Sequence, residues 1–599
     1  MKRIYQFICA FCLVCGFTAC NDMLDTNPDN IIKEDEYINK EDEIYKGMLG
    51  ILNRMQEAGD QAIWLTDTRA SVLETTDNAP DALKAIYNFD PTNGNEYADP
   101  TCYYAIIIAC NDFFHKMGEY HKNVGGMSES TENNFKALLS SAIRFKVWAY
   151  WMLGKIYGKA YWFDDPLTDM KDLSDTNIFT YCEMQQLADK CIGLLDNGIT
   201  VDGLSIPSDL KVNWAAWLNP ETEDATAYVQ WEYLVPPTIL LRAELVSWKC
   251  NYESEDAAQA DWLWIRDTLL KYLYDIHMAE EGTELPIPNY NTTDEQGELA
   301  MIFQTNLWLR FDLAHSYTTL FSSEEIGNKS QVVSAILYDY TNHQRNRLVQ
   351  YLCPAYPSND AFYLRPSQYG QDLYNEEDIR GITQRMVMDR INGQPCMTKY
   401  YMYYDGTART YKYLRTNIFE IQPSIITFRG HDFHFLLAEA ENHLGNWDQA
   451  ETILNKGITS RFPSNTLSDS TWCQYYASWF APRGGYGNAG IVGAAAGRVH
   501  KLPKPTDPNY NLSEAERKQI YDWAIADEHL KEYVAEGKSY SYLCKMAERY
   551  SNGGRGDQAA ARDSLIKRIV PKYTSAAAQQ KVRGSINGNG YFIQWDLKD

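Results

Sequence analysis

Residues 434–458 have the sequence HFLLAEAENHLGNWDQAETILNKGI, and this stretch decides the fold. Apolar residues recur at helical spacing on both sides of Gly445, which favours two helices with a glycine ending the first. Ala438, Gly445 and Ala450 are small at the spacing where two antiparallel helices must approach closely. The stretch therefore predicts a closely packed pair of helices.

Helix pairs of this kind are typical of tetratricopeptide-type repeats, which stack into a superhelix. Phe145–Tyr157 and Leu241–Trp264 look like further copies, although no strict repeat period survives. Ser513 and Glu516 have the spacing of a capping box and predict the start of another helix. We predict a mainly α fold, a tetratricopeptide-like helical superhelix with long loop-rich insertions and a few short strands, the latter at Val332–Leu337 and Thr398–Tyr404.

The N-terminus has the layout of a secretory signal in residues 1–19, with a basic start, an apolar run and small residues at its end. The apolar run is too short to span a bilayer. The ending Phe17-Thr18-Ala19-Cys20 resembles a bacterial lipobox, which predicts that Cys20 is lipidated and anchors the chain to a membrane. An ordinary cleaved signal is the alternative.

After the signal we expect a single body, residues 20–599, in which two kinds of segment alternate. Segments with helical periodicity form the scaffold and are expected over 38–58, 103–158, 236–280, 430–461 and 513–550. The loop-rich part, where long loops are usually functional, is expected over 59–102, 284–430 and 462–511. Residues 159–235 also lack a helical pattern that we could assign and are expected to be irregular.

The amino-acid composition limits the classes of ligand and partner that the protein could bind. The formal net charge of −25 argues against nucleic acid, because binding phosphates needs basic patches. Beyond Cys20 the cysteines are scattered and form no CxxC pair, so buried thiols are expected rather than metal ligands, although Cys182 and Cys191 could bridge. The 43 Tyr and 16 Trp are compatible either with a large helical core or with a surface that stacks on sugar rings.

Five segments, in order along the chain, resemble motifs of the SusD-like (RagB/SusD) family of outer-membrane, cell-surface glycan-binding lipoproteins. Lys146 and Ser539 stand where the family carries arginine, which puts individual ion pairs in doubt but not the fold. The five segments are Tyr104–Asn111, Phe145–Gly158, Tyr363–Ser367 with Asp378 and Arg380, Leu437–Ala440 with Gly445, and Asp527–Lys538.

The resemblance implies a protein that binds oligosaccharide and passes it to a SusC-type TonB-dependent outer-membrane transporter, without making or breaking a bond. It implies a lipid anchor, a location on the outer membrane facing the cell exterior, and no catalytic residues. Family ligand sites lie largely on loops near the N-terminal third and in the middle of the chain. The candidates there are Trp64, Asp67, Arg69, Asp77, Asn78, Asn93 and Tyr97, followed by Trp308, His343, Tyr351 and Tyr356.

Each candidate has a structural alternative, and we expect Asp67 and Arg69 to form an ion pair within the fold. His431 and His434 have metal-ligand spacing but lie in a helical pattern, which favours packing. The acidic loop Asn375–Asp378 lacks the spacing of an EF-hand, so we expect no cofactor, with a structural calcium ion left open. Two other functions stay open: a surface enzyme that degrades glycans, and a helical-repeat scaffold that binds peptides or proteins.

Overall fold

The structure is a computed structural model. It describes residues 38, 40–41, 43–90, 92–167, 177–218, 231–278, 320–321, 332–339, 342–354, 361–405, 410–413, 423–456, 491–495, 497–551 and 558–595. The signal with Cys20, and the candidates Trp308 and Tyr356, lie outside these residues.

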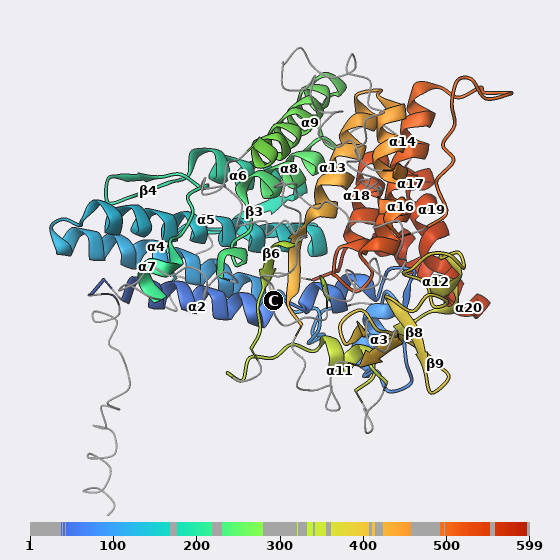
Figure 1. Ribbon diagram of the computed structural model, residues 1–599, viewed down its shortest axis with the longest axis horizontal. Helices are drawn as coiled ribbons and strands as arrows, with labels where there is room; N and C mark the ends of the chain where they lie inside the picture. Colours follow the sequence, from blue (N-terminus) through green and yellow to red (C-terminus); the bar gives the residue numbers. More distant parts are fainter. Residues whose placement is uncertain are drawn as a thin grey trace, which may run out of the picture.

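Helices dominate the described residues, which confirms the predicted mainly α class (Figure 1). Neighbouring helices pack as hairpins, α4 with α5, α8 with α9, α13 with α14 and α17 with α18, as tetratricopeptide-like packing requires. The scaffold helices are α2 (Glu43–Ala58), α4 (Thr101–Val124), α5 (Glu129–Tyr157), α6 (Met184–Asn197), α8 (Thr238–Lys249), α9 (Glu255–Met278), α13 (Gly430–His443), α14 (Trp447–Lys456), α17 (Glu514–Glu532), α18 (Ser539–Ser551), α19 (Gln558–Ile569) and α20 (Ala576–Asn589).

The predicted caps are present at several helix ends. Ser513 and Glu516 form the capping box at the start of α17, with the Ser513 N–H donating to the Glu516 carboxylate at 2.8 Å. Gly158 ends α5 in a left-handed conformation, and Gly445 has a φ of +80° between α13 and α14.

The structure also contains short helical elements between the scaffold helices. They are η2 (Ile63–Asp67), α3 (Asp81–Tyr87), α7 (Trp214–Leu218), α11 (Leu348–Leu352), α12 (Gln368–Asp372), α16 (Ile491–Ala494) and η9 (Val570–Lys572).

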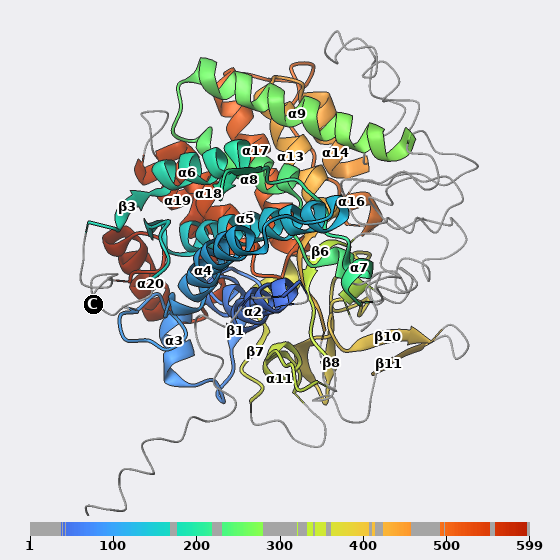
Figure 2. The same cartoon turned by 90° about the vertical axis from the view of Figure 1, so that its left-hand side faces the viewer.

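The core is centred on α5. Its residues from Ala137 to Leu153 are all buried, because α2 and α4 pack on one side of it and α6 and α8 on the other (Figure 2). Such a helix is apolar around most of its circumference, which explains why its sequence carries so many aromatic residues.

Strands occur only as antiparallel pairs among the described residues. β6 confirms the strand expected from residue 332, but it pairs with β12 far along the chain and not within a local hairpin. Of the stretch expected from 398 to 404, residues 402–404 lie in β10, and residues 398–401 link β10 to β9. The pairs are β1 (Leu73–Thr75) with β7 (Leu364–Pro366), β2 (Lys159–Trp162) with β3 (Thr180–Glu183), β4 (Ile199–Val201) with β5 (Leu204–Ile206), β6 (Val332–Ile336) with β12 (Ile425–Arg429), β8 (Met388–Ile391) with β9 (Gln394–Met397), and β10 (Met402–Asp405) with β11 (Thr410–Tyr413).

The expectation that residues 159–235 are irregular is wrong for much of that segment. It contains α6 and the four strands β2 to β5. The signal for α6 was in the sequence, since Leu187, Cys191 and Leu195 recur every fourth residue and are buried on one face.

A network of buried ion pairs joins the segment 361–405 to α17. Arg380 binds Asp378, Glu528 and Glu532 at 2.7–2.8 Å, and all four side chains are buried. Arg429 at the end of β12 binds the same Glu532 at 2.9 Å, so three distant segments share one cluster of charges.

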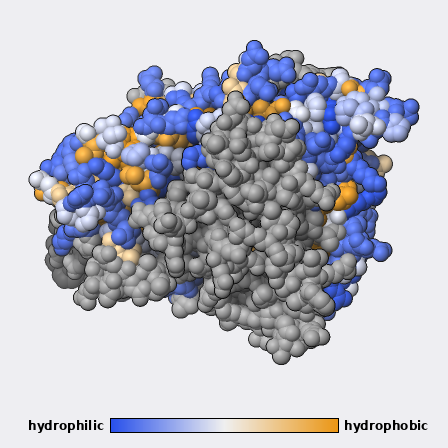
Figure 3. Space-filling model, turned by 45° about the horizontal axis from the view of Figure 1, so that its top comes forward, coloured by the Kyte–Doolittle hydropathy of each residue, from blue (hydrophilic) through white to orange (hydrophobic). Residues whose placement is uncertain are grey.

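The surface of the described residues is mainly hydrophilic on the face in Figure 3, where hydrophobic residues form small separate groups. None of the described helices combines the length and apolarity that a bilayer crossing demands. No disulfide joins the cysteines of the described part, including Cys182 and Cys191.

Candidate functional site

Four aromatic rings from four separate elements meet beside α11. They are Trp64 on η2, Tyr97 in the turn before α4, Tyr351 on α11 and Tyr363 just before β7, and we call them the aromatic cluster. Three of the four, Trp64, Tyr97 and Tyr351, were candidates from the sequence. The structure therefore brings together residues from the N-terminal third and the middle of the chain.

The rings contact one another directly. The Tyr351 ring lies 4.7 Å from the Trp64 ring and 4.6 Å from the Tyr363 ring, centroid to centroid, both at tilted angles. The hydroxyls of Tyr97 and Tyr351 lie 3.2 Å apart and share a hydrogen bond. Trp64, Tyr97 and Tyr351 are buried, whereas Tyr363 is half-buried and forms the accessible edge.

An ion pair borders the cluster. The Arg347 side chain binds the Asp60 carboxylate, with Nε 3.0 Å from Oδ2, and the Arg347 backbone N–H donates to the same oxygen at 2.8 Å. The Arg347 guanidinium carbon lies 5.9 Å from the Trp64 ring centre and 5.8 Å from that of Tyr351, within cation–π range. Although burial opposes it, Asp60 raises the pKa of Arg347, so the guanidinium stays charged.

Backbone pairing explains why these segments meet. The β1–β7 ladder sets Leu73 opposite Pro366, and it continues beyond the strands because the Thr76 N–H donates to the Tyr363 carbonyl at 2.8 Å. The Tyr363 N–H in turn donates to the Tyr351 carbonyl at 3.0 Å. One short sheet therefore holds α11 against η2.

Of the four rings, the half-buried Tyr363 is the one that is partly open to a ligand such as a sugar. Aromatic rings supply flat apolar faces, and the tyrosine hydroxyls and the guanidinium supply hydrogen-bond groups at their edges. Burial and the Tyr351 hydroxyl raise the pKa of Tyr97, so its hydroxyl stays protonated. The indole N–H of Trp64, whose side chain is 0% exposed, has no hydrogen-bond partner among the described residues.

The expected ion pair between Asp67 and Arg69 does not form. The Asp67 carboxylate accepts from the Gly537 N–H at 2.9 Å, while Arg69 donates to the Tyr591 carbonyl at 2.8 Å and stacks on Phe89. Sequence proximity suggested the pair, but η2 turns the two buried side chains toward different parts of the C-terminal region.

The other candidates lie at the surface. Asp77 and Asn78 follow β1, and Asn93 lies in the turn before α4; all three are exposed. His343 is also exposed and has a φ of +63°, in the left-handed region.

Sequence reasoning missed three residues of this site: Asp60, Arg347 and Tyr363. Tyr363 was part of a recognised motif, so its ring could have been chosen. Asp60 and Arg347 are 287 residues apart, and no local pattern predicts that pairing.

The computed fold has solved counterparts. A SusD homolog from Bacteroides thetaiotaomicron superposes with a TM-score of 0.52 at 12% identity, covering 92% of each chain. The chain has the SusD-like fold. Another SusD superfamily protein from Bacteroides thetaiotaomicron (TM-score 0.49, 14% identity, 85% of this chain and 90% of that one) and surface glycan-binding protein A from Bacteroides fluxus (TM-score 0.47, 10% identity, 90% and 98%) are also similar. No protein-family model and no curated protein matches the sequence.

Within this SusD-like fold, the remaining motif residues hold the scaffold together. Asp378, in the acidic loop, binds Arg380 in the buried network. His431 and His434 are buried in α13, and burial lowers the pKa of His434 to about 4, which agrees with the packing interpretation. Lys146, where the family carries arginine, binds Asp164 at 2.8 Å.

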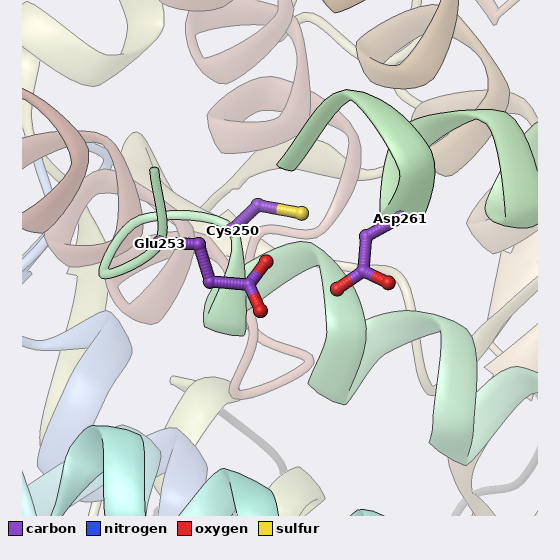
Figure 4. Close-up of side chains that lie close together, drawn as sticks. All are labelled: Cys250, Glu253 and Asp261. Carbon is purple, nitrogen blue, oxygen red and sulfur yellow. The ribbon is translucent and has the colours of Figure 1, made fainter. Parts of the chain in front are cut away.

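One group of side chains has metal-ligand types: Cys250, Glu253 and Asp261 lie together at the turn between α8 and α9 (Figure 4). However, the Lys249 ammonium lies 2.6 Å from the Glu253 carboxylate and 3.1 Å from that of Asp261. Burial raises the pKa of the Cys250 thiol, and its Sγ lies 3.9 Å from the Ala258 carbonyl. The cluster is explained as an ion pair that fastens the turn, with lysine as its cation.

Proposed function

We propose that this protein is a lipid-anchored, cell-surface binder of oligosaccharide that passes its ligand to a SusC-type TonB-dependent outer-membrane transporter without catalysis. The observation that carries the proposal is the aromatic cluster on a SusD-like fold, with ring faces, hydroxyls and a guanidinium at one place. The lipobox-like ending at Cys20 supports the anchor. A tethered binder is also held at high effective concentration near a transporter in the same membrane.

The experiment is calorimetric titration of the mature protein with a panel of neutral oligosaccharides. Replacing Tyr363, the accessible ring, with alanine should weaken binding about fivefold or more, because an aromatic contact contributes about 1 kcal/mol. Tyr363→Phe keeps the ring and should bind nearly as well as the native protein. Trp308→Ala tests the second expected stacking residue in the same assay.

Tyr181 provides a matched control, since it is an exposed tyrosine on β3, an element that takes no part in the aromatic cluster. Tyr181→Ala should leave the affinity unchanged. Absence of binding to every oligosaccharide, or equal binding by the Tyr363→Ala and Tyr181→Ala variants, would contradict the proposal. Release of reducing ends from the panel by the purified protein would favour the enzyme alternative.

A further inference from the structure

A second concave site lies away from the aromatic cluster. It is a pocket of about 660 Å³ between α4, α6, the end of β2 and the β4–β5 hairpin, and we call it the α4–α6 pocket. In Figure 1, α4 and β4 lie at the left and α6 above the centre, whereas α11 lies at the bottom near the middle. No residue lines both sites.

Three acidic residues line this pocket, and each already has a basic partner. The pairs are Asp164 with Lys146 at 2.8 Å, Glu119 with Lys116 at 3.2 Å, and Asp202 with His121 at 2.7 Å. Lysines therefore neutralise Asp164 and Glu119, whereas Asp202 is hydrogen-bonded to His121.

Two lysines of the pocket have no such partner. Lys190 on α6 and Lys122 on α4 form no ion pair with any described residue. The Lys190 ammonium lies 5.3 Å from the ring centre of Trp162, as does that of Lys146, so the indole holds two cations over the pocket floor. Since Asp164 and Glu119 have lysine partners, the two unpaired lysines outweigh the one remaining carboxylate, Asp202, and favour an anionic group here.

The same pocket contains a buried acceptor without a donor. The Asn111 side-chain nitrogen donates to the carbonyls of Phe163 and Asp165 at 3.3 Å, and its oxygen has no hydrogen-bond partner among the described residues. Asn111 is 1% exposed. An unsatisfied buried acceptor costs free energy, and a ligand hydroxyl would remove that cost.

Apolar side chains complete the wall, namely the half-buried Phe114, Leu194 and Ile199. Cations, a lone acceptor and an apolar wall together match a ligand with a carboxylate, hydroxyls and a hydrophobic ring face. We propose that the α4–α6 pocket binds a carboxylated sugar of the uronic acid type. This site goes beyond the proposed function and does not depend on the aromatic cluster.

The test is calorimetric titration of the mature protein with digalacturonate, with neutral galactobiose and with acetate. Digalacturonate should bind, while galactobiose and acetate should each bind at least about tenfold more weakly, the scale of one charge-assisted hydrogen bond. Raising the salt concentration should weaken the binding of digalacturonate, because screening acts on the partly exposed lysines.

Lysine substitutions test whether digalacturonate binds in the α4–α6 pocket. Lys190→Met and Lys122→Met should each weaken digalacturonate binding about tenfold, whereas Lys190→Arg should keep most of it. Lys136→Met is the matched control, because Lys136 pairs with Glu132 on α5 outside the pocket. Tyr363→Ala should leave digalacturonate binding unchanged, which separates this site from the aromatic cluster.

Any of four results would overturn the inference. They are no binding of digalacturonate, equal binding of galactobiose or of acetate, equal effects of Lys190→Met and Lys136→Met, or loss of digalacturonate binding in Tyr363→Ala. The last result would assign the acidic sugar to the aromatic cluster and leave the proposed function intact.

Discussion

Asp67 shows how one residue can make the stability of this protein depend on pH. Its carboxyl is buried on η2 and accepts the Gly537 N–H of the α17–α18 connection. Burial raises the pKa of Asp67 from its usual value of 3.8 to about 7. The folded chain therefore binds a proton between about pH 4 and pH 7 that the unfolded chain has lost, so this group's contribution to stability falls as the pH rises.

Replacing Asp67 with asparagine should remove this dependence, because the amide oxygen can still accept from Gly537 and carries no charge. We expect the free energy of unfolding of Asp67→Asn to exceed that of the native protein at pH 8. The difference should grow by up to about 1.4 kcal/mol per pH unit between pH 5 and pH 7. Urea denaturation at several pH values measures it.

Asp77→Asn is the control, because that side chain is exposed. Glu441, whose pKa burial also raises to about 7, is present in both proteins and cancels in the comparison. A difference between Asp67→Asn and the native protein that does not vary with pH would contradict the argument.

At the scale of elements, the turn between α13 and α14 shows how a glycine positions two helices. Gly445 has a φ of +80°, and a Cβ there would meet no atom within 4 Å. Only the backbone conformation therefore requires glycine, since a left-handed residue with a Cβ costs about 1 kcal/mol or more. Gly584 is the opposite case, because it lies inside the helix α20. A Cβ at Gly584 would also meet no atom within 4 Å.

The same substitution should therefore have opposite effects at the two glycines. Gly445→Ala should lower the free energy of unfolding by about 1 kcal/mol, and Gly445→Asn by less, because asparagine tolerates the left-handed region. Gly584→Ala should raise it by up to about 1 kcal/mol, since alanine has the higher helix propensity. Chemical denaturation measures all three, and a stabilising Gly445→Ala would refute the argument.

At the scale of the molecule, the buried charges decide how the loop-rich segments attach to the helices. Arg380 lies between Asp378 of its own segment and two glutamates of α17, and Arg429 joins β12 to one of them. Although burial opposes it, Arg380 holds the pKa of Glu528 well below its usual value. This contribution is present above the unfolded pKa near 4.5 and is lost as the pH falls below it.

Arg380→Met should destabilise the fold by about 3–5 kcal/mol, because it leaves buried carboxylates without their cation. Arg54→Met is the control, since Arg54 is 48% exposed and pairs with Glu57 on the surface of α2; its effect should stay within about 0.5 kcal/mol. Urea denaturation at neutral pH compares them. Equal stability of the two variants would show that the network does not hold the segments together.

The sequence predicted more of the helical scaffold than of the candidate site. The turn at Gly445 and the cap at Ser513 were predictable, because periodicity and capping are local properties of the chain. Trp64, Tyr97 and Tyr351 were named as single candidates, yet nothing local indicated that their rings meet. The pairing of Asp67 with Gly537 was equally out of reach, since 470 residues separate them.

The sequence by itself determined most of the scaffold helices and several of their ends, because neighbouring residues decide those features. Only the tertiary structure decided which distant side chains share a site: Asp60 with Arg347, Tyr351 with Trp64, and Lys190 with Lys122 at one pocket. The physical reason is that such contacts follow from how whole elements bury their surfaces together, and many pairings of buried side chains are compatible with the same local pattern.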